Sequence, residues 1–384
     1  MKNSIQKLLF IFGTRPEAIK MAPLILKAKN DSFFVVSVCV TGQHNEMLHQ
    51  VLDFFKITPD YNINIMTHDQ SLFDITADIL KELEIVLVKE NPNLVLVQGD
   101  TTTAFIGALA AFYMKIPVAH IEAGLRSNNK FSPFPEEINR VLVGHIADHH
   151  FTPTVKAKEN LLKEGKEPGT IYVVGNTVID ALFITLDLIK NREEEFRDYF
   201  NYLDFSKKVI LVTGHRRESF GKPFREICFA LKEIAERQDV EIVYPVHLNP
   251  NVRKPVFEIL TDIENIHLIE PLAYPYLIWL IGKSFFVLTD SGGIQEEAPS
   301  LGKPVLVMRD VTERIEGIEA GTCMLVGSHR KTILRNAYKL LDDKVFYKQM
   351  ATSVNPYGDG RSSEKILEII KKKIEEIVTQ NTKA

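Results

Sequence analysis

The chain alternates short apolar runs with longer amphipathic segments along most of its length, and this alternation constrains its fold more than any other feature. Apolar runs of about four to eight residues are typical of buried strands, and helices between them are typical of βαβ units. The small-residue segment Ile106–Met114 is typical of a crossover helix packed closely on a parallel sheet. The predicted fold class is therefore α/β with doubly wound sheets. The predicted strands of the first half are Leu8–Phe12, Phe34–Val40, Leu94–Val97, Val118–Ile121 and Ile171–Val174.

A second series of strands follows a charged and aromatic segment, Asn191–Lys208, which we interpret as a connection. We predict two Rossmann-like domains, residues 1–175 and 176–360, and a last helix within 361–384. Ligands of open α/β sheets bind beyond the carboxyl ends of the strands, so two such domains facing each other would enclose a cleft. The predicted strands of the second half are Val209–Val212, Glu241–Tyr244, Ile266–Ile269, Phe285–Leu288 and Val305–Val307.

The turns after the strands repeat between the two halves. Leu9-Phe10-Ile11-Phe12-Gly13-Thr14-Arg15-Pro16-Glu17 aligns with Ile210-Leu211-Val212-Thr213-Gly214-His215-Arg216-Arg217-Glu218. In the same way, Val97-Gln98-Gly99-Asp100-Thr101 aligns with Leu288-Thr289-Asp290-Ser291-Gly292. Polar residues that follow apolar strands in both halves indicate where the functional residues gather.

Composition excludes several classes of partner. The 384 residues include 46 Lys+Arg and 50 Asp+Glu, a net charge of −4, so the chain lacks the basic excess that holds nucleic acid. Its apolar runs fall short of the roughly 18 residues of a membrane span, and the N-terminal run is too short for a signal peptide. Cys39, Cys228 and Cys323 are few, odd in number and far apart, unlike a disulfide framework or a zinc site. We expect a cytoplasmic protein with neither nucleic acid nor membrane as partner.

Two turns have residues suited to phosphate. Asp290-Ser291-Gly292-Gly293 lies between a strand and a helix predicted over Ile294–Leu301, where free backbone N–H groups and the helix dipole hold anions. It matches neither the P-loop nor the dinucleotide fingerprint, which favours a diphosphate ester over nucleotide hydrolysis or NAD binding. Arg15 and Lys20 add a guanidinium and an ammonium after the first strand. The alternatives are a connecting glycine turn and an ion pair of Arg15 with a carboxylate.

Carboxylates gather in the first half at strand ends and in the next loop. An acid beside apolar strands has a perturbable pKa and can move a proton to or from carbon. The alternative is a salt-bridge network with Arg126 and Arg140. His215 lies in a glycine turn where a phosphate or leaving-group oxygen could reach it, whereas we interpret His145, His149 and His150 as structural. The carboxylates are Asp100, Glu122, Glu136 and Glu137.

Together, the motifs closely resemble the non-hydrolysing UDP-N-acetylglucosamine 2-epimerases of bacteria and archaea, over nearly the whole chain. The motifs are Gly13-Thr14-Arg15-Pro16-Glu17, Thr41-Gly42-Gln43-His44, Gln98-Gly99-Asp100-Thr101, His120-Ile121-Glu122-Ala123-Gly124-Leu125-Arg126, Pro135-Glu136-Glu137-Ile138-Asn139-Arg140, Gly214-His215-Arg216-Arg217-Glu218-Ser219 and Asp290-Ser291-Gly292-Gly293-Ile294-Gln295-Glu296-Glu297.

The resemblance implies two domains of the GT-B type, a last helix that packs back on the first domain, a homodimer, and no cofactor or metal. It implies interconversion of UDP-N-acetylglucosamine and UDP-N-acetylmannosamine by anti-elimination and re-addition of UDP. The implied catalytic residues are Asp100, Glu122, Glu136, Arg140 and His215. The implied diphosphate contacts are Arg15, Lys20, Ser291, Gly292, Gly293 and Arg314, with Glu297 on ribose and Leu272 to Leu277 around uracil. Gln43, His44 and Gln70 resemble positions where relatives bind a second, activating substrate molecule.

The chain departs from the family pattern after Thr312-Glu313-Arg314, where Ile315-Glu316-Gly317 replaces the usual Pro and Ala. Related UDP-sugars with acetamido groups at C2 and C3, or a carboxylate at C6, therefore stay open as substrates. A GT-B glycosyltransferase, a hydrolysing epimerase and a catalytically silent nucleotide-sugar sensor stay open as functions.

Overall fold

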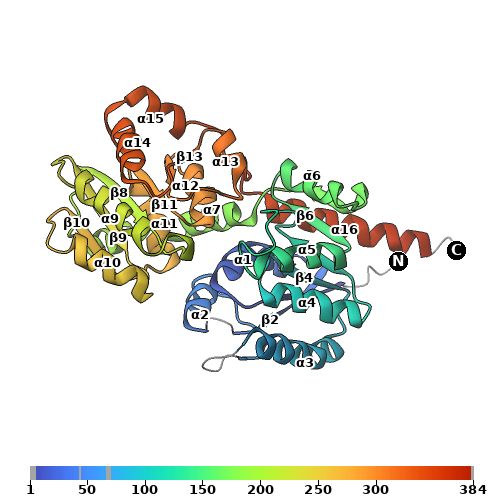
Figure 1. Cartoon of the computed structure of the whole chain (residues 1–384). Coiled ribbons are helices and arrows are strands. Elements are labelled where there is room, and N and C mark those ends of the chain that lie inside the picture. The colour runs from blue at the N-terminus through green and yellow to red at the C-terminus, as the bar shows by residue number, and fades with distance from the viewer. Residues whose placement is uncertain (1–5, 43–44, 66–70, 382–384) are drawn as a thin grey trace. The chain divides into compact units, whose positions relative to one another are not determined.

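A computed structural model of the chain describes residues 6–42, 45–65 and 71–381. The chain divides into two compact units, residues 1–181 with 357–384 and residues 182–356. Each unit contains a wholly parallel sheet with helices on its faces, as Figure 1 shows. The predicted α/β fold class is therefore confirmed.

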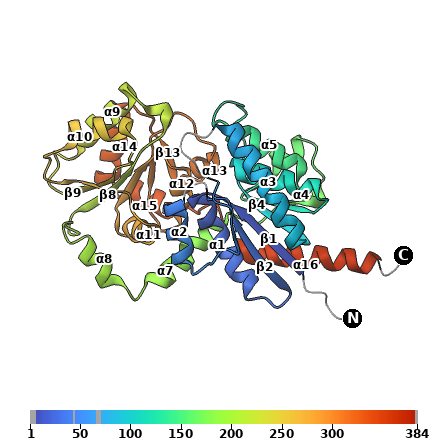
Figure 2. The ribbon, with the colours of Figure 1, turned by 90° about the horizontal axis from the view of Figure 1, so that it is seen from below.

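The first unit is a doubly wound sheet of strand order β3-β2-β1-β4-β5-β6-β7. Helices α3, α4 and α5 pack side by side on one face, and α1 packs with α2 and α16 on the other (Figures 1 and 2). Its elements are β1 (Gln6–Phe12), α1 (Arg15–Lys29), β2 (Phe34–Val40), α2 (Asn45–Phe54), β3 (Tyr61–Asn62), α3 (Leu72–Glu90), β4 (Leu94–Gln98), α4 (Thr102–Tyr113), β5 (Val118–Ile121), α5 (Glu136–Ile146), β6 (His149–Thr152), α6 (Val155–Lys163), the 3-10 turn η1 (Pro168–Thr170), β7 (Ile171–Val173), α7 (Thr177–Ile189), which runs across the division, and α16 (Ser362–Asn381).

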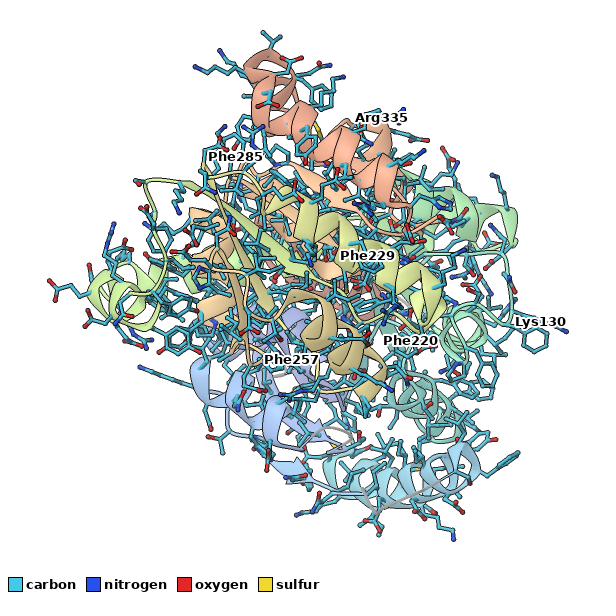
Figure 3. The ribbon with its side chains drawn as sticks, turned by 60° about the vertical axis from the view of Figure 1, so that its left-hand side comes forward. Lys130, Phe220, Phe229, Phe257, Phe285 and Arg335 are labelled. Carbon is cyan, nitrogen blue, oxygen red and sulfur yellow. The ribbon has the colours of Figure 1, made fainter. Side chains whose placement is uncertain are left out.

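The second unit has the strand order β10-β9-β8-β11-β12-β13, and α9 packs against α10 and α14 over a large apolar core. Phe220, Phe229 and Phe285, labelled in Figure 3, line the rim of this core. Its elements are α8 (Glu193–Tyr199), β8 (Lys208–Thr213), the 3-10 turn η2 (Arg217–Ser219), α9 (Lys222–Ile234), β9 (Val240–Pro245), α10 (Pro250–Leu260), β10 (Ile266–Ile269), α11 (Tyr274–Lys283), β11 (Phe286–Thr289), α12 (Gly292–Ser300), β12 (Val305–Val307), α13 (Ile315–Glu319), β13 (Cys323–Leu325), α14 (Arg330–Asp342) and α15 (Lys344–Ala351).

The central strands show why the polar turns gather. β1 lies between β2 and β4, and β8 lies between β9 and β11, so the two sheets share one topology around their centres. In the first sheet, β1 and β4 are hydrogen bonded from Leu8 opposite Leu94 onward, and in the second, β8 and β11 from Ile210 opposite Phe286. Because the strands are parallel, the turns after β1 and β4 emerge at the same edge, and so do those after β8 and β11.

The last helix, α16, belongs to the first unit. Its first residues lie on the buried carboxylate of Asp180 in α7, which accepts from the backbone N–H groups of Ser362 (3.1 Å) and Ser363 (2.7 Å). Lys27 of α1 donates to Glu364 of α16 at 2.9 Å. The segment that enters the helix packs closely on Gly175, where an added Cβ would lie 2.6 Å from the hydroxyl of Ser362. The segment before α16 therefore packs against Gly175 so closely that a side chain there would clash with it.

Two helices differ from the expectations. The segment 191–208 is not a plain connection, because it contains α8, whose Phe196 is fully buried and stacks on Trp279 of α11. Helix α12 begins at Gly292, two residues before the predicted start. The glycines gave no signal of helix, because glycine is a poor helix former in helix interiors and is favoured only at helix ends.

Candidate active site

The turn after β1 is organised by a capping box. Thr14 is the N-cap of α1 and Glu17 is its third residue, and Pro16 occupies the first turn of the helix, where its missing N–H costs nothing. Oε2 of Glu17 accepts from the backbone N–H groups of Gly13 (3.1 Å) and Thr14 (2.8 Å). Arg15 begins the helix and is half-buried. The turn therefore holds Arg15 at the carboxyl edge of the sheet.

The turn after β4 carries Asp100, and side chains from two other elements hold it in place. On α5, Asn139 donates from Nδ2 to the main-chain oxygen of Asp100 at 3.0 Å, and Arg140 donates from Nη2 to its carboxylate. On β5, Nε2 of His120 donates to the oxygen of Gly99 at 2.8 Å. Burial lowers the pKa of His120 to about 3, so this ring is neutral and acts as a donor through one nitrogen.

Glu122 follows β5 with a φ of 64°, in the left-handed region that non-glycine residues seldom occupy. Its buried carboxylate receives the ammonium of Lys20 from α1 and the amide of Asn176, which donates from Nδ2 at 2.8 Å. Strained backbone of this kind clusters at functional sites, where the surroundings must hold it. Here Lys20 faces a carboxylate, so the cation expected on a diphosphate is engaged with Glu122 in this structure.

Glu136 and its neighbour Glu137 have different surroundings. Glu137 is buried and accepts from the backbone N–H groups of Ser127 (3.0 Å) and Asn128 (3.0 Å), which holds the loop before α5. Glu136 begins α5, and its Oε2 is buried without a hydrogen-bond partner among the described residues. An unpaired buried carboxylate oxygen is costly and marks a functional candidate. Glu136, not Glu137, is therefore suited to proton transfer.

The salt-bridge alternative holds for only part of this cluster. Arg140 pairs with Asp100, as that alternative expects. Arg126, in contrast, donates to Glu164 of the segment after α6 with Nε at 2.7 Å and Nη2 at 2.8 Å. Arg126 therefore holds the end of α6 and, among the described residues, is paired with neither Glu122 nor Glu136. The loop that leads from Arg126 to α5 is exposed at its tip, where Lys130 extends outward (Figure 3).

In the second unit, Asp290 organises the turn after β8 from the neighbouring strand β11. Its Oδ2 accepts from the backbone N–H groups of His215 (2.7 Å) and Arg216 (2.8 Å). The His215 ring is 42% exposed, lies 3.6 Å from Oδ1 of Asp290, and stacks on His247 with ring centroids 5.0 Å apart. Burial and the neighbouring His215 lower the pKa of His247. This arrangement presents one exposed imidazole beside a buried carboxylate.

The start of α12 lies beside a buried arginine. Ser291 is the N-cap, and an added Cβ at Gly292 would lie 2.7 Å from the guanidinium carbon of Arg314, so any side chain there would have to displace this guanidinium. Arg314 donates from Nε to Glu296 at 2.9 Å and also pairs with Glu313. Burial would raise the pKa of Glu313, but Arg314 and Arg309 outweigh it and hold that pKa well below its usual range. The first N–H groups of α12 and Arg314 thus lie together, as an anion site requires.

The remaining predicted contacts also lie in the second unit. Gly293 stands near Glu297, where an added Cβ would lie 3.5 Å from Oε2. Glu297 is buried and its Oε1 accepts from the hydroxyl of Tyr274 at 2.8 Å. Leu272 is buried before α11, and Leu277 is half-buried within it. Gln43, His44 and Gln70 lie outside the described residues.

Sequence reasoning missed the residues that hold the turns. Glu17 and Asn139 stand inside the motifs and Asn176 outside them, and nothing in the sequence pattern shows which neighbour each one contacts. The alignment of the two halves pairs Asp290 with Gly99 and places Asp100 one position later, which is the single signal that the two aspartates differ in role. Among the described residues, no three His, Cys, Asp or Glu side chains are grouped so that they could hold a metal ion.

Two doubly wound units with carboxylates at the strand ends of one and a helix N-terminus with arginine in the other define an α/β nucleotide-sugar enzyme of the GT-B type. The model of the UDP-N-acetylglucosamine 2-epimerase family matches residues 26–371. The chain belongs to this family, as the motifs predicted, and is an epimerase.

Relatives agree over almost the whole chain. The UDP-N-acetylglucosamine 2-epimerase of Campylobacter jejuni is 55% identical over 376 residues, which cover 95% of this chain and 97% of that protein. The crystal structure of the enzyme from Neisseria meningitidis bound to UDP-GlcNAc has a TM-score of 0.92 at 49% identity, covering 96% of this chain and 100% of the other. The Methanocaldococcus jannaschii enzyme, in complex with UDP-GlcNAc and UDP, has a TM-score of 0.83 at 38% identity, covering 95% and 99%.

Proposed function

We propose that the protein interconverts UDP-N-acetylglucosamine and UDP-N-acetylmannosamine. The observation that carries the proposal is the set of carboxylates at the strand ends and in the next loop of the first unit. Asp100 pairs with Arg140, Glu122 pairs with Lys20, and Glu136 has a buried oxygen without a hydrogen-bond partner among the described residues. Binding a nucleotide sugar does not require three such acids. Removing a proton from C2 and returning one to the other face does require acid–base groups.

The proposed reaction has two balanced halves. A carboxylate takes the C2 proton while the C1–O bond breaks, so the electron pair of C2–H forms the C1=C2 double bond and UDP leaves with the pair of the broken bond. A 2-acetamidoglucal remains. UDP then adds back to C1 as an acid delivers a proton to the opposite face of C2. Asp100, Glu122 and Glu136 are the acid–base candidates, and Arg140 orients Asp100 through the observed pair.

Charge develops on the departing diphosphate, and the cationic groups of the site are suited to it. Ser291, Gly292 and Gly293 offer the first N–H groups of α12 beside Arg314, and His215 offers an exposed ring. Groups held in place before the reaction stabilise such charge without reorganisation. We assign Arg15 and Lys20 to the diphosphate as well, which requires Lys20 to turn from Glu122 when substrate binds. Glu297 is assigned to ribose, and Leu272 to Leu277 to uracil.

A proton NMR time course with UDP-N-acetylglucosamine tests the proposal. We expect the anomeric signal of UDP-N-acetylmannosamine to grow to a constant ratio, with no acceptor sugar added. A glycosyltransferase would leave the substrate unchanged without an acceptor, and a hydrolysing epimerase would release UDP in step with turnover. If only diacetamido or 6-carboxylate UDP-sugars react, the reaction class stands and the proposed substrate is wrong.

We also propose a homodimer in the cytoplasm. Helices α3 and α4 lie side by side, and their outer surfaces expose Ile85, Val88, Phe112 and Tyr113, each at about 60%. Apolar side chains grouped on one surface are typical of an interface. A free, buried state of all three cysteines fits a reducing compartment. Light scattering after gel filtration should give twice the 43.7 kDa of the chain, and a single-chain mass would contradict the dimer.

Activation by a second substrate molecule, through Gln43, His44 and Gln70, completes the proposal. Conversion of purified UDP-N-acetylmannosamine should then begin slowly and accelerate as the other epimer accumulates. A trace of added UDP-N-acetylglucosamine should remove the lag. Full-speed conversion from the first moment would contradict this activation.

Among the described residues, no helix is both long and apolar enough to cross a membrane.

A further inference from the structure

Glu17 is a buried carboxylate that the proposed reaction does not use. Its side chain is in the first turn of α1, and the residue is only 2% exposed. Burial raises its pKa to about 7, although hydrogen bonds from Thr101, Thr14 and Gly13 oppose the rise. A group that costs this much to bury needs a reason to be present.

The two carboxylate oxygens of Glu17 contact two different turns. Oε2 accepts from Gly13 N at 3.1 Å and Thr14 N at 2.8 Å, in the turn after β1. Oε1 accepts from the hydroxyl of Thr101 at 2.7 Å, in the turn after β4. Thr101 directly follows Asp100, and its hydroxyl also caps α4 by accepting from Ala104 N at 3.0 Å.

Asp100 is consequently held from two sides. Asn139 and Arg140 hold it from α5, and Glu17 holds the next residue from α1. The Glu17–Thr101 bond joins the turn bearing Arg15 to the turn bearing Asp100, beyond the last paired residues of β1 and β4. A shift of about 1 Å in the distance between such turns can lower a rate by about a hundredfold.

Helix capping alone does not account for this carboxylate. The capping box at α3 uses Ser71 and Asp74, and there the same acid oxygen accepts from both the N–H (3.0 Å) and the hydroxyl (2.6 Å) of Ser71. That box lies on the surface, and these bonds stay within one turn. Glu17 differs because its second oxygen reaches another strand's turn. The burial of Glu17 and its hydrogen bond to Thr101 therefore indicate a role in addition to helix capping.

We propose that Glu17 is a positioning residue of the active site, which sets the spacing of Asp100 from Arg15 through its bond to Thr101. This inference rests on the proposed function, because it assigns Asp100 to the chemistry. Glu17 itself does not touch substrate. It acts by keeping two turns of the same sheet edge at a constant separation.

The test is the pair Thr101→Val and Thr101→Ser, because both leave the capping box of α1 intact. Valine keeps the shape and removes the hydroxyl, whereas serine restores it. The matched control is Thr154→Val, since Thr154 caps α6 in the same unit by accepting from Ala157 N at 3.1 Å. It corrects for the loss of a threonine cap, which costs about 1 kcal/mol.

We expect Thr101→Val to lose more thermal stability than Thr154→Val, because it also leaves Oε1 of Glu17 without its donor. We expect only Thr101→Val to lose turnover, by about tenfold to a hundredfold in kcat. Thr101→Ser should recover kcat to within about twofold of the wild type. Equal kcat in the two valine variants would overturn the inference and leave the epimerase activity intact. Failure of the wild type to epimerise would overturn the proposed function itself, and the inference with it.

Discussion

The turns after the first strand of each unit, Gly13–Glu17 and Gly214–Glu218, have matching sequences and different chemistry. In the first unit, the turn's own acid, Glu17, folds back and accepts from two of its amides. In the second, Glu218 is largely exposed and pairs with Arg309 at 3.0 Å, and the amides of the turn are held by Asp290 of the neighbouring strand.

The difference shows how one topology serves two tasks. β4 and β11 occupy equivalent places beside the first strand of each sheet, and each ends near an aspartate. Asp290 is 2% exposed, and its carboxylate accepts hydrogen bonds from both backbone amides of the turn. Asp100 has its carboxylate on Arg140 and is partly exposed. In the first unit, the turn's own acid holds the amides, and the neighbouring aspartate pairs with a side chain instead.

Replacing the acid–base candidates should give the largest effects. Asp100→Asn, Glu122→Gln and Glu136→Gln each preserve shape and remove a titratable group. We expect kcat to fall by about a hundredfold to ten-thousandfold, with UDP affinity within about threefold of the wild type by calorimetry. Near-normal turnover in all three variants would mean that these carboxylates form only a salt-bridge network.

Glu17 should give the next largest effect, in the pH dependence of stability. Its pKa is raised from 4.5 to about 7, so the folded state binds this proton more tightly than the unfolded state. The resulting stability is fully present below pH 4.5 and is lost as the pH rises through about 7. Relative to Glu17→Gln, the wild type should lose up to about 3 kcal/mol across this range.

Chemical denaturation of both proteins at several pH values measures that difference. The subtraction cancels titrations that the two proteins share. A constant difference from pH 4.5 to pH 7 would contradict the raised pKa and the burial that causes it.

Asp290 should matter for stability where Asp100 does not. Asp290→Ala leaves the amides of His215 and Arg216 without their acceptor, which should cost roughly 2 kcal/mol of unfolding free energy and weaken UDP binding. Asp290→Asn keeps an oxygen there and should lose less. Thermal melts of these variants and of Asp100→Asn sharpen the comparison, and equal melting temperatures for Asp290→Ala and Asp100→Asn would contradict it.

The smallest effect concerns the family's missing proline. Ile315 is the first residue of α13 and 46% exposed, and Arg314 before it has ψ of 54°, outside the helical region that proline disfavours. Ile315→Pro should therefore stabilise the protein by about 0.5 kcal/mol, or raise the melting temperature by roughly 1–2 °C. A lower melting temperature would show that the loop cannot take the proline conformation.

Much of the fold could be predicted because buried parallel strands are continuous apolar runs. Each strand predicted from such a run is present, within a residue or two at its ends. Strands β3 (Tyr61–Asn62) and β13 (Cys323–Leu325) were missed because runs of two or three residues carry no periodicity. Strand β6 (His149–Thr152) was missed because two histidines begin it and it is not an apolar run. Helix α8 was interpreted as part of a connection because its stability depends on packing against Trp279. That contact joins residues far apart in the chain, so the local sequence does not show it.

The site could be predicted only to the level of its turns. Their positions directly after strands predict that Asp100 and Glu122 lie at the carboxyl edge of the first sheet and Asp290 at that of the second. The side chains that each one contacts depend on packing. The pairing of Lys20 with Glu122 was not predicted, and it arises because α1 brings Lys20 to the end of β5. Arg126 was expected among the acids and lies on Glu164. Such pairings depend on side-chain direction in three dimensions, which spacing along the chain does not encode.

The most direct measurement is the fate of the hydrogen at C2 when UDP-N-acetylglucosamine is converted in heavy water. We predict product with deuterium at C2 and none at C3 or C4, because an acid–base group exchanges its proton with solvent before returning one to the other face. Transient oxidation at a neighbouring carbon could return the same hydride without exchange. Epimerised product with C2 fully protiated, under conditions where an acid exchanges with water faster than turnover, would contradict the elimination mechanism.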